Sequence, residues 1–99
     1  MSVQQVLDAL ADPARRAVVR TLAHARRDLS CGSFDLPVGR STSSHHLAVL
    51  RAAGLLRQYY VGTTKMNALR TQEVERRFPG LLPAVVAAAD AEAREAPAT

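Results

Sequence analysis

The stretch that organises this chain runs from Arg40 to Leu69 and reads RSTSSHHLAVLRAAGLLRQYYVGTTKMNAL. Its first part has the residue spacing of an amphipathic helix over residues 41–53. At about 100° per residue, Leu47 and Leu50 fall on one side of this helix and His45 falls on the other. One side is therefore expected to pack in a core, and the other is free to contact a partner.

The outward side of this helix suits DNA better than it suits protein. The hydroxyl groups of Ser41 and Thr42 are expected to cap the free amides of the first turn, and Gly54 fits a left-handed C-terminal cap. The outward side otherwise carries short polar side chains and alanines, which suit base edges and phosphates in a major groove. A helix that fills a protein groove needs large apolar anchors, and here Val49 is the only candidate.

Two short strands are expected after the helix, at about residues 56–69. The first is rich in aromatic and branched side chains, and Val61-Gly62-Thr63-Thr64 provides a tight turn. Because a two-stranded ribbon alone is marginal in water, it should pack on the helices while its tip projects. Tyr59 and Tyr60 alternate along the first strand, so one should face the core and the other solvent or DNA.

A family resemblance rests on two motifs, Ser41 to Leu56 and Leu10-Ala11-Asp12-Pro13-Ala14-Arg15-Arg16. The first resembles the recognition-helix motif of the ArsR-type winged helix-turn-helix repressors, and the second resembles the entry into the second helix of that family. The resemblance implies a mainly α fold with a small β-wing, in a single domain over residues 1–99. It implies a recognition helix at about 41–53, a wing at about 56–69, and C-terminal helices at about 72–78 and 81–95.

The positive charge of the chain is concentrated in the organising stretch. The 99 residues carry a formal net charge of +4, yet residues 36–72 contain five basic residues and no acid. The flanking parts are close to balanced. A solvated basic surface is the plain alternative, but the coincidence with the helix and the ribbon favours phosphate contact.

The N-terminal part predicts two helices. Apolar residues spaced at i, i+3, i+4 and i+7 predict a short helix over residues 2–11. Asp12-Pro13 predicts the start of a second helix that continues to about Ala25. Three arginines of this second helix can either reach phosphates or stay solvated, namely Arg15, Arg16 and Arg20.

Residues 26–39 should hold the first helix of the helix-turn-helix. Pro37 and two glycines leave room for only one or two turns. The expected core anchors of this segment are Phe34, Leu36 and Val38.

The first and last helices each carry an apolar stripe that a chain of this size has no second layer to cover. Thr71 is expected to cap the helix over residues 72–78, and the last helix follows it. The resemblance implies that the first and last helices form a homodimer, although both stripes can instead fold back onto one monomeric core. The expected interface residues are Val3, Val6, Leu7, Leu10, Leu82, Val85, Val86 and Ala89.

Histidine and cysteine form no recognisable metal or cofactor site in the sequence. His45 and His46 diverge by about 100° on a helix, so they cannot hold one metal ion, and His46 should make a structural hydrogen bond. Metal-sensing members of the resembled family use paired cysteines, or histidines with carboxylates, and neither set is present around Cys31 or on the last helix. Cys31 is either a small buried side chain or a redox-active thiol.

The sequence therefore predicts a homodimeric repressor that binds a pseudo-palindromic operator in double-stranded DNA, with no cofactor and no identified effector. No phosphate-binding loop, carboxylate pair or activated nucleophile indicates an enzyme, and a winged-helix module that binds protein instead of DNA is the alternative. No apolar run approaches the roughly 20 residues that span a bilayer and no signal-peptide pattern is present, so we expect a cytoplasmic protein. Base contacts are expected from Ser41, Thr42 and His45, phosphate contacts from Arg40, Ser44, Arg51, Arg57 and Lys65, and wing-tip contacts from Thr63 and Thr64.

Overall fold

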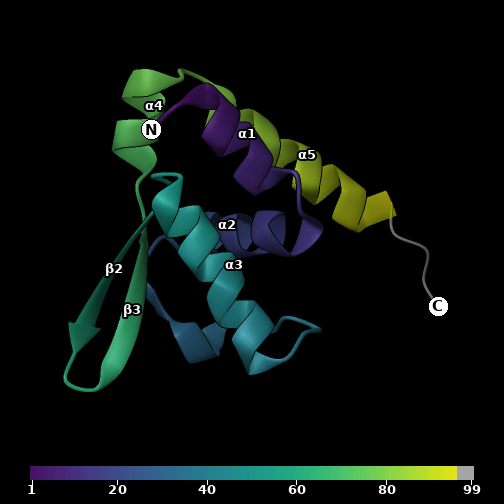
Figure 1. The fold of residues 1–99 in the computed structure, drawn as a ribbon. Helices are drawn as coiled ribbons and strands as arrows, with labels where there is room; N and C mark the ends of the chain where they lie inside the picture. The colour runs from purple at the N-terminus through teal and green to yellow at the C-terminus, as the bar shows by residue number, and fades with distance from the viewer. Residues whose placement is uncertain (96–99) are drawn as a thin grey trace.

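The computed structural model describes residues 1–95 and shows a group of helices with a small sheet at one side (Figure 1). The ribbon of β2 and β3 projects away from the helices, while α1 and α5 both lie over one side of α2. The predicted fold class, mainly α with a small β-wing, is confirmed. In chain order the elements are α1 (Val3–Leu10), α2 (Pro13–Ala25), β1 (Leu29–Ser30), the 3-10 turn η1 (Cys31–Ser33), α3 (Arg40–Ala52), β2 (Leu56–Val61), β3 (Thr64–Leu69), α4 (Thr71–Arg77) and α5 (Leu81–Glu95).

Helix α2 occupies the centre of the core, where it packs against α1, α3 and α5. Its Val18 and Val19 are completely buried. Full burial of a side chain of this size contributes about 1.5–3 kcal/mol relative to exposure. Burial in this core fixes α3 against α2. Other buried members of the core are Val6, Leu10, Leu22, Leu47, Leu50, Leu55, Leu56, Val74 and Leu82.

The sheet has three strands in the order β1-β3-β2, and both pairings are antiparallel. The two-residue strand β1 is too short to give a sequence signal, and the sequence predicted two strands only. Asn67 of β3 holds β1 in place. The side chain of Asn67 is fully buried, and its Nδ2 donates a hydrogen bond to the carbonyl oxygen of Leu29 at 3.2 Å. The Oδ1 atom of Asn67 accepts from Nε2 of Gln58 at 2.8 Å, which ties β2 to the same side chain.

The segment before α3 is more irregular than predicted. In place of a helix of one or two turns, it contains the 3-10 turn η1 and then irregular backbone up to α3. Phe34 and Leu36 are half-buried against the core, as expected. Val38 is 37% exposed, so its prediction as a core anchor is wrong. It lies between Pro37 and Gly39, where no helix can hold its side chain against the core.

The helix ends follow the sequence signals only in part. Asp12 caps α2, since its Oδ1 accepts from the amides of Ala14 at 2.8 Å and Arg15 at 3.2 Å. Burial raises the pKa of Asp12, but these amide hydrogen bonds outweigh it and leave the pKa below its usual value.

Two predicted hydroxyl caps are wrong. The cap residue of α3 is Gly39, and that of α4 is Arg70, so neither helix has a side-chain cap. The expected capping residues lie inside the first turns instead, Ser41 and Thr42 in α3 and Thr71 in α4. At the other end of α3, Gly54 has a φ of 90°, in agreement with the left-handed conformation predicted for it.

Helix α5 is 15 residues long. No helix within residues 1–95 is both long enough and apolar enough to cross a bilayer.

Candidate nucleic-acid interface

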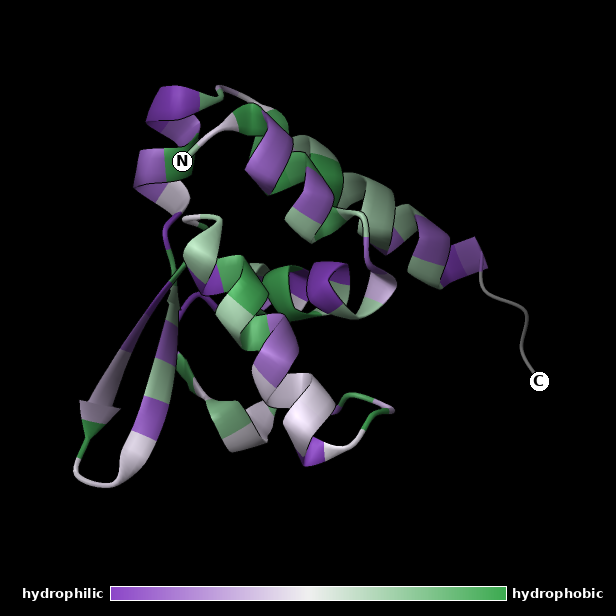
Figure 2. Ribbon diagram, in the orientation of Figure 1, coloured by the Kyte–Doolittle hydropathy of each residue, from purple (hydrophilic) through white to green (hydrophobic). Residues whose placement is uncertain are grey.

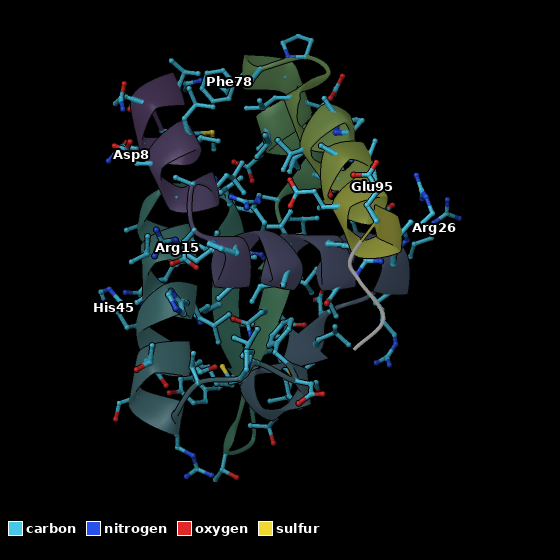
Figure 3. The ribbon with its side chains drawn as sticks, turned by 90° about the vertical axis from the view of Figure 1, so that its right-hand side faces the viewer. Asp8, Arg15, Arg26, His45, Phe78 and Glu95 are labelled. Atoms are coloured by element: carbon cyan, nitrogen blue, oxygen red, sulfur yellow. The ribbon has the colours of Figure 1, made fainter. Side chains whose placement is uncertain are left out.

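The N-terminal half of α3 presents a polar surface to solvent. Ser41, Thr42, Ser44 and His45 are all exposed, and His45 points away from the helices in Figure 3. Figure 2 shows the same division, with α3 pale to purple toward its N-terminal end and green toward its C-terminal end. These are four of the six residues of α3 predicted for DNA contact, and they are accessible together.

The opposite face of α3 is held by the core and by one polar anchor. Leu47 and Leu50 are 2% and 0% exposed. His46 is also buried, and its Nδ1 lies 3.2 Å from Nη1 of Arg15 on α2, so the predicted structural role of His46 is confirmed. The Nε atom of Arg15 donates to the carbonyl oxygen of Ala9 at 2.6 Å. Arg15 thus connects the end of α1 to the recognition helix (Figure 3).

The arginines of α2 make contacts within the chain. The sequence had suggested only phosphate contact or exposure to solvent for them. Arg16 donates Nη1 to the carbonyl oxygen of Leu10 at 2.8 Å, beside the Arg15 contacts at the end of α1. Arg20 donates Nε to the carboxylate of Asp90 on α5. These side chains hold α1 and α5 against α2. Spacing along α2 could not show this, because the acceptors lie on other helices.

Exposed aromatic and aliphatic side chains mark the outer part of the wing. Tyr60 is 65% exposed and Val61 is 62% exposed. Lys65 pairs with Tyr60 across the ribbon, and its Nζ atom lies 5.9 Å from the centre of the Tyr60 ring. Thr63 and Thr64 complete an exposed tip. Sequence reasoning predicted that one of the two tyrosines would face solvent, but it did not single out Tyr60 and Val61 as contact residues.

Tyr59 instead faces the body of the protein. Its hydroxyl donates a hydrogen bond to the carboxylate of Asp28, and this interaction raises the pKa of Tyr59 above its usual value. The guanidinium carbon of Arg57 lies 4.9 Å from the centre of the Tyr59 ring, which holds that arginine against the root of the wing.

Arg51 and Arg57 do not lie with the polar end of α3. Arg51 is in the last turn of α3, and at 1.5 Å per residue it lies roughly 16 Å along the helix from Arg40. Arg51 and Arg57 each line a groove of about 390 Å³ beside Arg70 and Glu73. The hydrogen bonds from Arg70 lower the pKa of Glu73, so this carboxylate stays charged and offsets part of the local positive charge.

The residues predicted for a dimer interface occupy two environments. Val6, Leu10 and Leu82 are at most 5% exposed in the single chain, so their side chains already belong to its own core. Val85, Val86 and Ala89 are half-buried on α5. Of the α1 residues predicted for the dimer interface, Val3 and Leu7 remain accessible, with 50% and 48% of their surface exposed.

Cys31 and Asp90 make contacts with other side chains of the same chain. Cys31 is half-buried, and its Sγ lies 3.3 Å from Nδ2 of Asn67. Asp90 accepts from Arg20 and from Nε2 of His24 at 2.8 Å, and these two hydrogen bonds lower the pKa of Asp90. Within residues 1–95, no three His, Cys, Asp or Glu side chains come close enough together to hold a metal ion.

A helix with an accessible polar end, held from behind by α2 and followed by a projecting β-ribbon, defines a winged helix-turn-helix protein. Residues 10–59 match the family described as a helix-turn-helix domain. The chain therefore belongs to this helix-turn-helix family.

Two curated proteins and one solved structure illustrate the relationship. The chain is 41% identical over 78 residues to the HTH-type transcriptional regulator Rv2034 of Mycobacterium tuberculosis, covering 71% of this chain and 73% of the relative. It is 35% identical over 80 residues to the uncharacterized HTH-type transcriptional regulator YceK of Bacillus subtilis, covering 79% and 80%. An ArsR-like transcriptional regulator from Rhodococcus has a TM-score of 0.63 and 26% identity, covering 93% of this chain and 82% of that structure. With the two curated relatives, this likeness places the chain among the ArsR-type winged helix-turn-helix transcriptional regulators.

Proposed function

We propose that this regulator is a homodimeric repressor that binds a pseudo-palindromic operator. The observation that carries the proposal is the accessible polar N-terminal half of α3, whose opposite face is fixed by Leu47, Leu50 and the Arg15–His46 contact. A helix held in this way can enter a major groove with its N-terminal residues against base edges and without reorganising the core.

The contacts divide into base contacts and phosphate contacts. Ser41, Thr42 and His45 would contact base edges, and their exposure at the end of α3 that would enter the groove supports this assignment. Arg40 and Ser44 flank them and would fix the register on phosphates.

The wing supplies a second set of contacts. Thr63, Thr64 and Lys65 at its tip would contact the backbone or the minor groove beside the site read by α3. Arg51 and Arg57 lie toward the other end of α3, so they would reach phosphates only where the DNA bends toward the root of the wing.

The proposed dimer brings two copies of α3 to successive turns of one face of the DNA, about 34 Å apart. Val3 and Leu7 support it, because two half-exposed aliphatic side chains one turn apart on α1 form an apolar patch that a second copy would cover. We place this activity in the cytoplasm and assign the protein no catalytic role, cofactor or effector.

Fluorescence anisotropy with DNA from the protein's own upstream region tests the proposal. The expected result is tighter binding to this DNA than to a scrambled duplex. The affinity for both should fall as the salt concentration rises, because protein binding releases cations from the DNA phosphates. Equal binding to both duplexes would contradict base reading at that DNA. No binding at low salt would contradict the DNA-binding role and would favour a protein-interaction module.

A further inference from the structure

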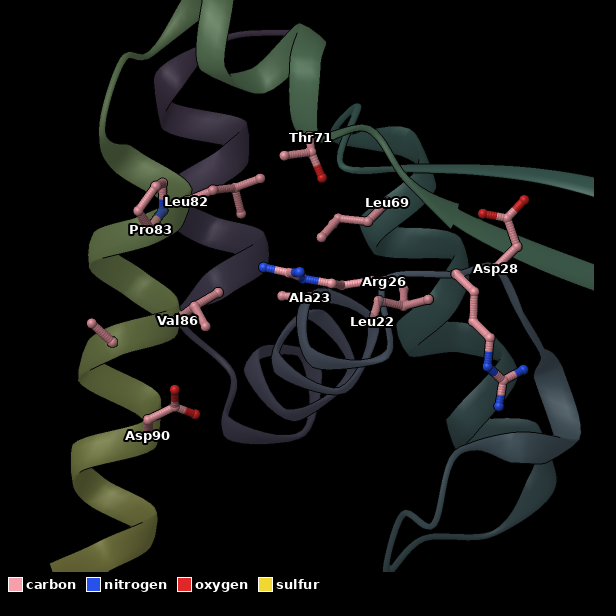
Figure 4. A pocket seen from close by; sticks show the side chains of 12 residues that line it. Leu22, Ala23, Arg26, Asp28, Leu69, Thr71, Leu82, Pro83, Val86 and Asp90 are labelled. Carbon is pink, nitrogen blue, oxygen red and sulfur yellow. The ribbon is translucent and has the colours of Figure 1, made fainter.

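A hollow of about 720 Å³ lies between the end of α2, the first turns of α5 and the junction of β3 with α4. Figure 4 shows it from close by, with aliphatic side chains converging from three elements. Pockets that bind small organic molecules have volumes of about 300–1,000 Å³ and mostly apolar walls. The apolar part of this wall includes Leu22, Leu69, Leu82 and Val86.

Arg26 stands at the edge of this hollow in an unusual backbone conformation. It is the only residue other than glycine within residues 1–95 that has a positive φ, which is 54°. Arg26 is the C-terminal cap residue of α2, where a left-handed conformation is common, and this conformation turns the chain beside the hollow. In Figure 4 the side chain of Arg26 extends across the hollow toward Leu82 and Val86 on α5.

The positive charge of Arg26 is available to a ligand. Neither Arg26 nor its neighbour Arg27 forms an ion pair within residues 1–95. The two carboxylates at the hollow are already engaged, because Asp90 accepts from Arg20 and His24, and Asp28 accepts from Tyr59. The Tyr59 hydroxyl is neutral, so Asp28 keeps its negative charge, but Arg26 and Arg27 together outweigh it and the hollow carries a net positive charge.

We propose that the hollow binds a small amphipathic organic acid. Its carboxylate or sulfonate would accept from the guanidinium of Arg26, and its apolar body would lie against Leu22, Leu82 and Val86. The hydroxyl of Thr71, which lines the same space, can bond a second polar group of the ligand. This site is independent of DNA binding, so its test needs no operator.

The probe for the test is 8-anilinonaphthalene-1-sulfonate, an aromatic sulfonate whose fluorescence rises in apolar surroundings. We expect saturable binding with one site per chain, competed by octanoate more effectively than by the uncharged 1-octanol. In Arg26→Gly the affinity should fall about tenfold or more, because a charge-assisted hydrogen bond is lost. Glycine adopts a positive φ without strain, so this variant should unfold at the same temperature as the wild type or a higher one.

Two further variants locate the site. Ala87→Phe places a large side chain from α5 at the hollow and should also abolish binding of the probe. Arg94→Ala removes an arginine near the end of α5 that does not line the hollow, and it should leave the affinity unchanged.

Three results would overturn the proposal. Binding that is unchanged in both Arg26→Gly and Ala87→Phe would place the probe elsewhere. Equal competition by octanoate and 1-octanol would remove the role of the positive charge. If Ala87→Phe instead converts a dimer to monomers in sedimentation velocity while the probe still binds, the hollow is an interface between two copies.

Discussion

Nη1 of Arg15 on α2 lies 3.2 Å from Nδ1 of His46 on α3. A guanidinium can only donate hydrogen bonds, so Nδ1 must be the acceptor and the ring proton of His46 is on Nε2. Arg15 also donates to the carbonyl oxygens of Ala9 at 2.6 Å and Asp8 at 3.3 Å. One side chain of α2 therefore links α3 to the end of α1.

Replacing Arg15 should lower stability, but the buried Leu47 and Leu50 still hold α3 against the core, so the folded variant should keep its DNA affinity. Arg15→Met removes hydrogen bonds from a charged group to three acceptors, and we expect the free energy of unfolding to fall by about 1–3 kcal/mol. Arg40→Met, an exposed arginine at the start of α3, should show the reverse pattern. Urea unfolding and anisotropy titration on the same samples check both. A folded Arg15→Met protein that no longer binds DNA would contradict a purely structural role for Arg15.

Two side chains on the outer face of α3 should determine operator discrimination. In the double variant Thr42→Ala with His45→Ala, each lost base contact should cost about 1–3 kcal/mol of discrimination between operator and scrambled DNA. Thr21→Ala with His24→Ala is the matched control, since these exposed residues have the same spacing on α2. Far-UV circular dichroism should be unchanged in both proteins. Discrimination that survives in the α3 variant would remove Thr42 and His45 from the base contacts.

Leu7 and Val6 should respond differently to a charge. Leu7→Asp places a carboxylate on the exposed side of α1, so it should convert the proposed dimer to folded monomers. Val6 is 0% exposed, and Val6→Asp should unfold the chain instead. Sedimentation velocity with circular dichroism distinguishes these outcomes, and a Leu7→Asp dimer would place the interface elsewhere.

The contact of Asp90 with Arg20 and His24 should make stability depend on pH. Because these hydrogen bonds lower the pKa of Asp90 below the usual 3.8, the charged form stabilises the folded state. The stabilisation is complete above pH 3.8 and is lost as the pH falls through the lower pKa of the folded state. Asp90→Asn should be less stable than the wild type at pH 7, and the difference should shrink in acid. Thermal unfolding from pH 7 to pH 2 measures it, and a constant difference would contradict the linkage.

Gly54 should tolerate alanine less well than Gly32 does. Gly54 has a φ of 90°, and an added Cβ would lie 2.7 Å from Cε of Met1. The methionine end is flexible, so the backbone strain should dominate, at about 1–3 kcal/mol. At Gly32 an added Cβ meets no atom within 4 Å, and the φ is not positive. Chemical unfolding of Gly54→Ala and Gly32→Ala tests this, and equal stabilities would contradict the strain.

The parts of the fold that the sequence predicts are those with long or strongly local signals. The apolar spacing around Leu47 and Leu50 extends over several turns, and Asp12-Pro13 combines a cap with a favoured first residue. The strand β1 escaped prediction because it is two residues long and depends on Asn67, which lies far along the chain. The missing caps of α3 and α4 show that hydroxyl groups near a predicted start do not fix which residue begins the helix.

The sequence predicted which face of a single helix each candidate residue lies on. It could not predict which residues come together from different helices and strands. Helical spacing correctly placed His45 outward and His46 inward. It could not show that Arg51 and Arg57 gather beside Arg70, because their proximity arises from the way α3, β2 and α4 meet. The role of Arg15 was hidden for the same reason, since its acceptors lie on α1 and α3.

The short strand β1 also determines where this protein can accept insertions. It pairs with β3 only at Asn67 and Met66, so the wing is three strands wide at its root and two strands wide toward its tip. The exposed turn at Gly62 and Thr63 therefore lies beyond the part of the sheet that β1 supports. Extra residues or a fluorescent label introduced there would lengthen the wing without disturbing the core.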